Sequence, residues 1–191
     1  MICDVKLKQS FKLIALFLTF PAFISACSNA KTVSAKPSKK ELYLVSHPPK
    51  RAITKINALI PHAIKWYNNV EKTLYSKGRS LTPAEKRQAK VLGVKNPSAI
   101  RVVILEKFPE PNNQTANNHF EGARAMGNII MIKPRHKNNS IVLCHELVHV
   151  AQKDRMGLKQ FLTRYALERE VLGYSKSLLE NEAYALQQAI Q

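Results

Sequence analysis

Apolar residues recur at helical spacing in the part of the chain that follows residue 50. Between residues 51 and 75 they fall three or four positions apart, which predicts an amphipathic helical segment with lysines on its outer face. Pro61 lies inside this segment, so we expect a kink or two separate helices. The sequence Thr82-Pro83-Ala84-Glu85 has the pattern of a capping box, and Gly93 is a typical stop signal. A further helix is therefore predicted between them.

Two short runs of β-branched and apolar residues follow. Residues 99–105 predict one strand and residues 125–132 a second, with a polar loop at 109–118 between them. Helical patterns return over residues 141–156, 161–172 and from 178 to the end. This order predicts an α+β fold with N-terminal helices, a small antiparallel sheet and a closing set of helices.

The N-terminal residues have the pattern of a secretory signal. Lysines precede an apolar run over residues 13–24, which is too short for a membrane-spanning helix of about 20 residues. The sequence Ile24-Ser25-Ala26-Cys27 resembles the lipobox of bacterial lipoproteins. The resemblance implies a signal peptide at 1–26, lipid attachment to Cys27, and a place on the extracytoplasmic or periplasmic face of a bacterial cell envelope.

Residues 27–50 are rich in serine, alanine and lysine and have no apolar periodicity. They predict a flexible, lipid-anchored tether, followed by a folded domain over residues 51–191.

The positive charge is distributed unevenly along the chain. Residues 1–140 hold 24 Lys+Arg and 7 Asp+Glu, which accounts for the whole net charge of +17, whereas residues 141–191 hold six of each. Trp66 stands among lysines, as in a stacking platform, but one aromatic residue is not a signature of nucleic-acid binding. We therefore expect the basic part to favour an anionic envelope surface, and expect no nucleic-acid partner.

The sequence His145-Glu146-Leu147-Val148-His149 is an HExxH motif within the predicted helix 141–156. Residues four apart lie on one side of a helix, so both imidazoles can reach one Zn²⁺ at about 2.0–2.1 Å. Glu146 projects beside the metal, where it can act as a general base. The surrounding residues are apolar, and burying these polar groups is costly without partners such as a metal. The alternative is a core helix whose polar groups are satisfied by other residues.

Here the chain resembles the gluzincin branch of zinc metallopeptidases. More narrowly, residues 80–188 resemble short bacterial zincin-like domains of envelope and toxin-delivery proteins. The resemblance implies that a glutamate on a later helix completes the site, and Asn181-Glu182-Ala183-Tyr184-Ala185 matches that setting. Glu182 is the preferred third ligand, because Glu180 would point about 200° away around the helix. Glu168 and Glu170 stay open as alternatives.

The resemblance also implies an edge strand beside the HExxH helix that binds an extended substrate, a role that residues 126–132 would fill. Two features depart from the related families: no histidine follows His149, and Leu186 and Gln187 stand where gluzincins often have an aspartate. Tyr174 or Tyr165 is a candidate oxyanion donor, with core packing as the alternative for each.

These observations together predict a zinc-dependent metallopeptidase anchored in the cell envelope. His145, His149 and Glu182 would hold Zn²⁺, and Glu146 would activate a metal-bound water toward a peptide or protein substrate. Cys144, beside His145, is expected to be a buried small hydrophobe and not a nucleophile. The alternative function is a non-catalytic, zinc-stabilised module that binds an envelope protein or an anionic polymer.

Overall fold

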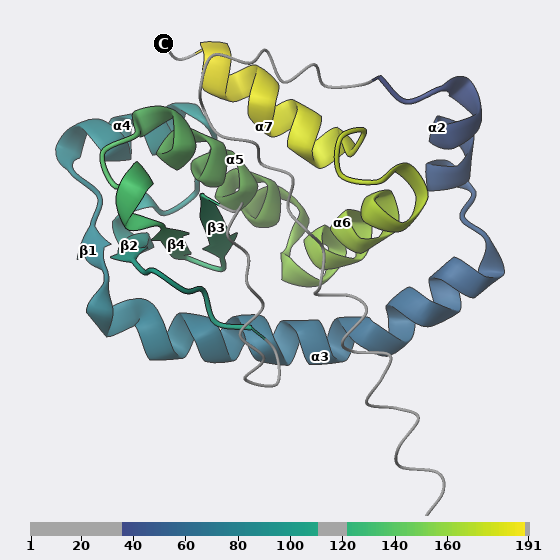
Figure 1. Cartoon of the computed structure of the whole chain (residues 1–191), viewed down its shortest axis with the longest axis horizontal. Coiled ribbons are helices and arrows are strands. Elements are labelled where there is room, and N and C mark those ends of the chain that lie inside the picture. The colour runs from purple at the N-terminus through teal and green to yellow at the C-terminus, as the bar shows by residue number, and fades with distance from the viewer. Residues whose placement is uncertain (1–35, 111–121, 190–191) are drawn as a thin grey trace, which may run out of the picture.

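The computed structural model describes residues 36–110 and 122–189 (Figure 1). Within them the chain forms six α-helices and one four-stranded sheet, which confirms the predicted α+β class. The signal peptide and Cys27 lie outside the described residues. None of the helices in the described part combines the length and the hydropathy that crossing a membrane requires. The helices are α2 (Lys39–Ser46), α3 (Lys50–Leu74), α4 (Pro83–Val91), α5 (Ser140–Met156), α6 (Leu158–Leu172) and α7 (Leu178–Ala189).

Part of the predicted tether is helical. Helix α2 begins with a capping box in which Ser38 and Glu41 satisfy each other's backbone N–H groups. It lies against α6, and Lys176 in the loop after α6 donates to Glu41 at 2.7 Å. The folded part therefore begins before residue 51. The capping box can be read from the sequence, but the lysine-rich composition around it led to the prediction of a flexible segment.

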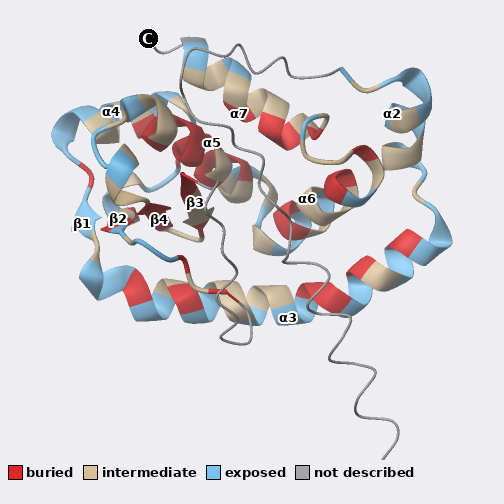
Figure 2. Cartoon of the chain, in the orientation of Figure 1, coloured by how far each residue is buried: buried red, intermediate tan, exposed pale blue. Residues whose placement is uncertain are grey.

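Helix α3 is a single helix of 25 residues that continues through Pro61. Pro61 is exposed, while Ile56 and Ile60 are buried before it and Val70 and Leu74 after it. The missing N–H of the proline thus lies at the outer face, and the buried stripe packs on both sides of it. Figure 2 shows this alternation of buried and exposed residues along α3. The expected division into two helices is wrong.

The sheet is mixed and not purely antiparallel. Its strands are β1 (Arg79–Ser80), β2 (Arg101–Ile104), β3 (Ala123–Met126) and β4 (Ile129–Ile132), in the order β1-β2-β4-β3. Strand β2 is parallel to β4, whereas the pairs β1–β2 and β3–β4 are antiparallel. The described residues thus contain one parallel pair that the prediction did not include.

The predicted strand 125–132 is a hairpin of two strands. Gly127 and Asn128 form its turn, and Gly127 has a positive φ of 65°. Strand β4 is an inner strand with partners on both sides, so the edge strands of the described sheet are β1 and β3, and β3 is the one that packs against α5. An edge strand beside the HExxH helix was expected over residues 126–132, and the structure has it at Ala123–Met126.

The sheet stands between α5 and α3. Ile130 and Ile132 pack toward α5 in one cluster that also holds Leu147. Ile129 and Met131 face the opposite way, toward the end of α3. Side chains of a strand alternate between its two faces, so β4 contributes to both cores, and all four of its residues are buried. Helices α6 and α7 extend this core on the far side of α5, where they pack against α3 and α5 respectively.

The hairpin turn is held by a hydrogen-bonded carboxylate. Glu71 on α3 accepts from the Asn128 side chain at 2.8 Å, and a Cβ atom at Gly127 would overlap the Glu71 carboxylate. Gly127→Ala should therefore destabilise the fold by about 1–2 kcal/mol for its left-handed backbone and by about 1 kcal/mol more for the displaced hydrogen bond. Urea unfolding measures the loss.

Gly93→Ala is the matched control, because Gly93 has a φ of 92° but open space where a Cβ would lie. It should show the conformational cost alone. Equal losses in the two variants would contradict the proposed role of Glu71.

Candidate metal centre

The two histidines of the HExxH motif project from the middle of α5. Asn139 begins this helix by accepting from the backbone N–H groups of Ile141 and Val142. Leu147 is fully buried among the sheet residues and fixes the rotation of the helix. The imidazoles of His145 and His149 consequently face the same side, with their Nε2 atoms 3.2 Å apart.

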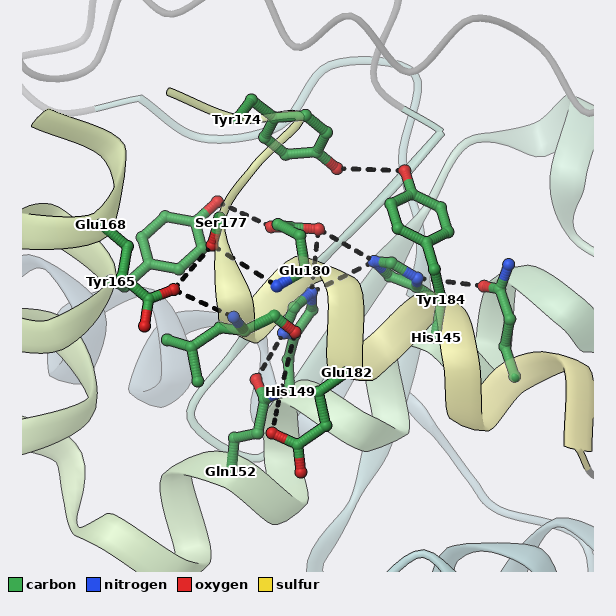
Figure 3. A network of polar contacts seen from close by, with 12 residues as sticks. His145, His149, Gln152, Tyr165, Glu168, Tyr174, Ser177, Glu180, Glu182 and Tyr184 are labelled. Atoms are coloured by element: carbon green, nitrogen blue, oxygen red, sulfur yellow. Dashed lines mark hydrogen bonds and ion pairs between the residues drawn. The ribbon is translucent and has the colours of Figure 1, made fainter. Parts of the chain in front are cut away.

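Glu180 on α7 completes the cluster. Its Oε2 atom lies 3.3 Å from Nε2 of His145 and 3.6 Å from Nε2 of His149 (Figure 3). Ligand atoms that surround a zinc ion tetrahedrally with bonds of 2.0–2.1 Å lie about 3.3 Å from one another. The three atoms are thus already spaced for such an ion. Among the described residues, Glu180 Oε2 is the buried side-chain oxygen for which no hydrogen-bond partner is found.

The structure places Glu182 outside this cluster. Both of its carboxylate oxygens bond to Arg155 at 3.0 Å, and one also accepts from Gln152. The carboxylate that meets the two histidines in this structure is therefore that of Glu180, which the prediction placed second to Glu182. The spacing could have shown it, because Glu180, Ala183 and Gln187 lie three and seven residues apart, along the side of α7 that meets α5. The prediction instead followed the resemblance of Asn181-Glu182-Ala183 to the gluzincin setting.

Each candidate ligand has a hydrogen-bond partner behind it. Gln187 Oε1 lies 3.0 Å from Nδ1 of His145, and Gln152 Oε1 lies 2.9 Å from Nδ1 of His149. Tyr165 donates to the other oxygen of Glu180 at 3.1 Å. Such contacts orient metal ligands. Gln187 thus provides an orienting contact near the place where the expected aspartate is missing.

The charges of the cluster shift its protonation. Burial alone would lower the pKa of His149, but the carboxylates of Glu180 and Glu146 raise it to about 9. Burial alone would raise the pKa of Glu180, but the two imidazoles hold it well below its usual range. Burial and the charge of Glu180 raise the pKa of Tyr165. The Glu180 carboxylate and the protonated His149 ring therefore attract each other. The Tyr165 hydroxyl keeps its proton and can donate a hydrogen bond to Glu180.

Two further tyrosines stand beside the cluster. The Tyr184 ring lies 4.7 Å from the His145 ring, and its hydroxyl is 3.4 Å from that of Tyr174. Burial, followed by the charge of Glu180, raises the pKa of Tyr174. Of the two predicted oxyanion donors, Tyr165 is engaged with Glu180, whereas Tyr174 belongs to this hydroxyl pair. Tyr184 follows Glu180 by four residues, a spacing that could have indicated it.

Other candidate residues have structural roles. Cys144 is buried, and burial raises the pKa of its thiol, which confirms the expected small hydrophobe. Glu170 pairs with Lys55 at the surface. Glu168 is fully buried and accepts from Ser177 and from the backbone N–H of Leu179, both at 2.9 Å. Glu168 thus fixes the start of α7, the helix that carries Glu180.

Comparison with known proteins adds no relative. No family model, curated protein or solved structure matches this chain. The resemblance to zinc metallopeptidases therefore rests on the residues themselves.

Glu168→Gln should destabilise the metal-free protein by roughly 1–3 kcal/mol, because both carboxylate oxygens accept hydrogen bonds. Whichever way the new amide points, its NH₂ group meets a donor: Arg164 on one side, Ser177 and Leu179 on the other. Urea unfolding measures the loss. Glu170→Gln serves as the control, and its partly exposed ion pair should cost less than about 1 kcal/mol. A larger loss of stability in Glu170→Gln than in Glu168→Gln would argue against the capping role of Glu168.

Proposed function

We propose that the protein is a zinc-dependent metallopeptidase, with His145, His149 and Glu180 as metal ligands. The observation that carries the proposal is the convergence of two Nε2 atoms and one carboxylate oxygen in a cluster of buried side chains. Two imidazoles and a carboxylate are a donor set found in catalytic zinc sites, and it leaves a fourth position for water or substrate. The spacing of the three atoms supports the same choice of metal, as does the lack, among the described residues, of a hydrogen bond to Glu180 Oε2, which faces the two imidazoles.

Glu146 is the proposed general base. A bound zinc ion would supply Lewis acidity and lower the pKa of a coordinated water. Glu146 is buried, directly follows His145 in the chain, and is close enough for its charge to raise the pKa of His149. From there its carboxylate can accept a proton from the attacking water and return it to the leaving amine. Tyr184, whose ring lies against His145, and Tyr174, which is paired with it, are the proposed hydroxyl donors for the developing oxyanion.

The edge strand β3 is the proposed place for an extended peptide substrate. It packs against α5, the helix that carries both histidines. In an antiparallel hairpin alternate residues bond to the partner strand, so the others turn their backbone groups to the edge. The register of the β3–β4 pair assigns that edge to Ala123 and Ala125. A peptide or protein segment can add there as a further strand.

We propose that this domain is held at the bacterial cell envelope by lipid attached to Cys27. The support is the lipobox-like sequence before Cys27 and the signal pattern ahead of it. The exposed charged residues of α3 are all basic: Lys50, Arg51, Lys65 and Lys72. Such a set of cations suits an anionic envelope surface.

A zinc-stabilised binding module without catalysis is the second candidate. The cluster joins α5 to α7, so a metal there would also fasten the C-terminal helix to the core. The two functions differ in what they require of Glu146.

Metal analysis tests the ligand set. The purified protein should hold one zinc per chain, and Glu180→Gln or His149→Ala should weaken zinc binding by more than about 100-fold, beyond the range for outer contacts. Glu182→Gln should still bind one equivalent when zinc is in excess. Retention of zinc by Glu180→Gln and its loss from Glu182→Gln would reverse the assignment of the third ligand.

Glu146→Gln separates the enzyme from the binding module. Peptide hydrolysis should fall by about 10²–10⁴-fold, because the amide cannot take the proton, while bound zinc stays. Peptide libraries and peptidoglycan fragments, monitored by mass spectrometry, provide the assay. Zinc-loaded wild-type protein that cuts none of them would favour the binding module.

A further inference from the structure

Gln152 is a fully buried side chain that lies between His149 and Glu182 (Figure 3). Its Nε2 group donates to the backbone carbonyl of Leu179 at 2.9 Å and to Oε2 of Glu182 at 3.1 Å. An amide nitrogen has two hydrogens, so both are used. The orientation of the amide is therefore fixed by two acceptors on α7, and Oε1 must be the atom that faces His149.

This orientation determines which nitrogen of His149 carries a proton when the ring is neutral. Gln152 Oε1 can only accept, and it lies 2.9 Å from Nδ1 of His149. Nδ1 must then be the donor, which leaves the lone pair on Nε2. Nε2 is the atom that meets His145 and Glu180. A reversed amide would present N–H to Nδ1 and favour a proton on Nε2, where it would block metal binding.

We infer that Glu182 is a positioning residue for the metal site and acts on His149 through Gln152. In the reversed orientation Gln152 Oε1 would face the Leu179 carbonyl and the Glu182 carboxylate, and two acceptors without a proton between them repel each other. The negative charge of Glu182 makes that state especially unfavourable. This inference rests on the proposed zinc site and assigns to Glu182 a different role from that of a ligand.

The ion pair with Arg155 gives Glu182 a second possible role, which is purely structural. Arg155 and Glu182 are joined by two hydrogen bonds, with side-chain exposures of 58% and 33%. Exposed ion pairs of this kind contribute little to stability. Gln152 and one Arg155 nitrogen share Oε2 of Glu182, and the other Arg155 nitrogen bonds Oε1. The two contacts can be separated by substitution, because replacing Arg155 leaves the Glu182 carboxylate in place as an acceptor for Gln152.

Zinc affinity, measured by competition with a chromophoric chelator, tests the inference. Glu182→Gln should weaken zinc binding by up to about 10- to 100-fold, because its amide can donate to a reversed Gln152 and so removes the share of the penalty that the Glu182 carboxylate contributes, while the Leu179 carbonyl still opposes that state. Arg155→Gln is the matched control: it removes the ion pair but leaves the Glu182–Gln152 contact, and it should change the affinity less than about twofold. The urea midpoint of the metal-free protein should be the same for both variants.

A double-mutant cycle adds a second test. If Glu182 acts only through Gln152, adding Glu182→Gln to Gln152→Leu should cause no further loss of zinc affinity. If Gln152→Leu does not fold, the comparison of Glu182→Gln with Arg155→Gln decides alone.

The outcomes separate this inference from the proposed function. Zinc-binding wild-type protein with unchanged affinity in Glu182→Gln overturns the positioning role only. An equal loss in Arg155→Gln assigns the effect to the ion pair and also overturns it. Wild-type protein that takes up no zinc overturns the metal site, and this inference with it.

Discussion

The burial of the Glu180 carboxylate against two imidazoles is the constraint on which the arrangement of the last three helices depends. Glu180 is 2% exposed, and removing a carboxylate from water costs several kcal/mol unless charges and donors replace the water. Tyr165 from α6 donates to one oxygen, and the imidazoles of α5 stand against the other. All three helices must therefore meet at one point, and a cation at that point would complete the compensation.

Helix α7 is fixed at its start as well as at its centre. Glu168 holds the first turn from α6, and Gln152 on α5 bonds the carbonyl of Leu179 one residue before Glu180. These contacts join α7 to both neighbouring helices through buried polar groups with fixed directions. Apolar packing alone would allow α7 to rotate or slide, whereas this set of donors and acceptors selects one rotation. That selection is what places Glu180, and not Glu182, at the histidines.

The features that sequence reasoning found are those with local physical causes. The α+β class, the capping box at Thr82 and the pairing of His145 with His149 follow from spacing within one element. The hairpin at Gly127 was missed because the apolar run continues across the turn on both sides. The place of Glu180 beside the histidines was missed because it depends on how α7 rotates against α5. That rotation is set by contacts between residues distant in the sequence, such as Gln152 with Leu179, which no local pattern reveals.

The strongly basic composition and the chemistry of the cluster are largely independent of each other. The pKa values of His149 and Glu180 are shifted first by their burial and then by the charges of their immediate neighbours, the histidines and carboxylates of the cluster. The exposed cations of α3 lie on the outer face of that helix, away from the core that it shares with α6. Exposed charges are screened over about 8–10 Å at physiological salt, and buried pairs much less. The protonation of the His145–His149–Glu180 cluster is therefore set by its neighbours and not by the net charge of +17.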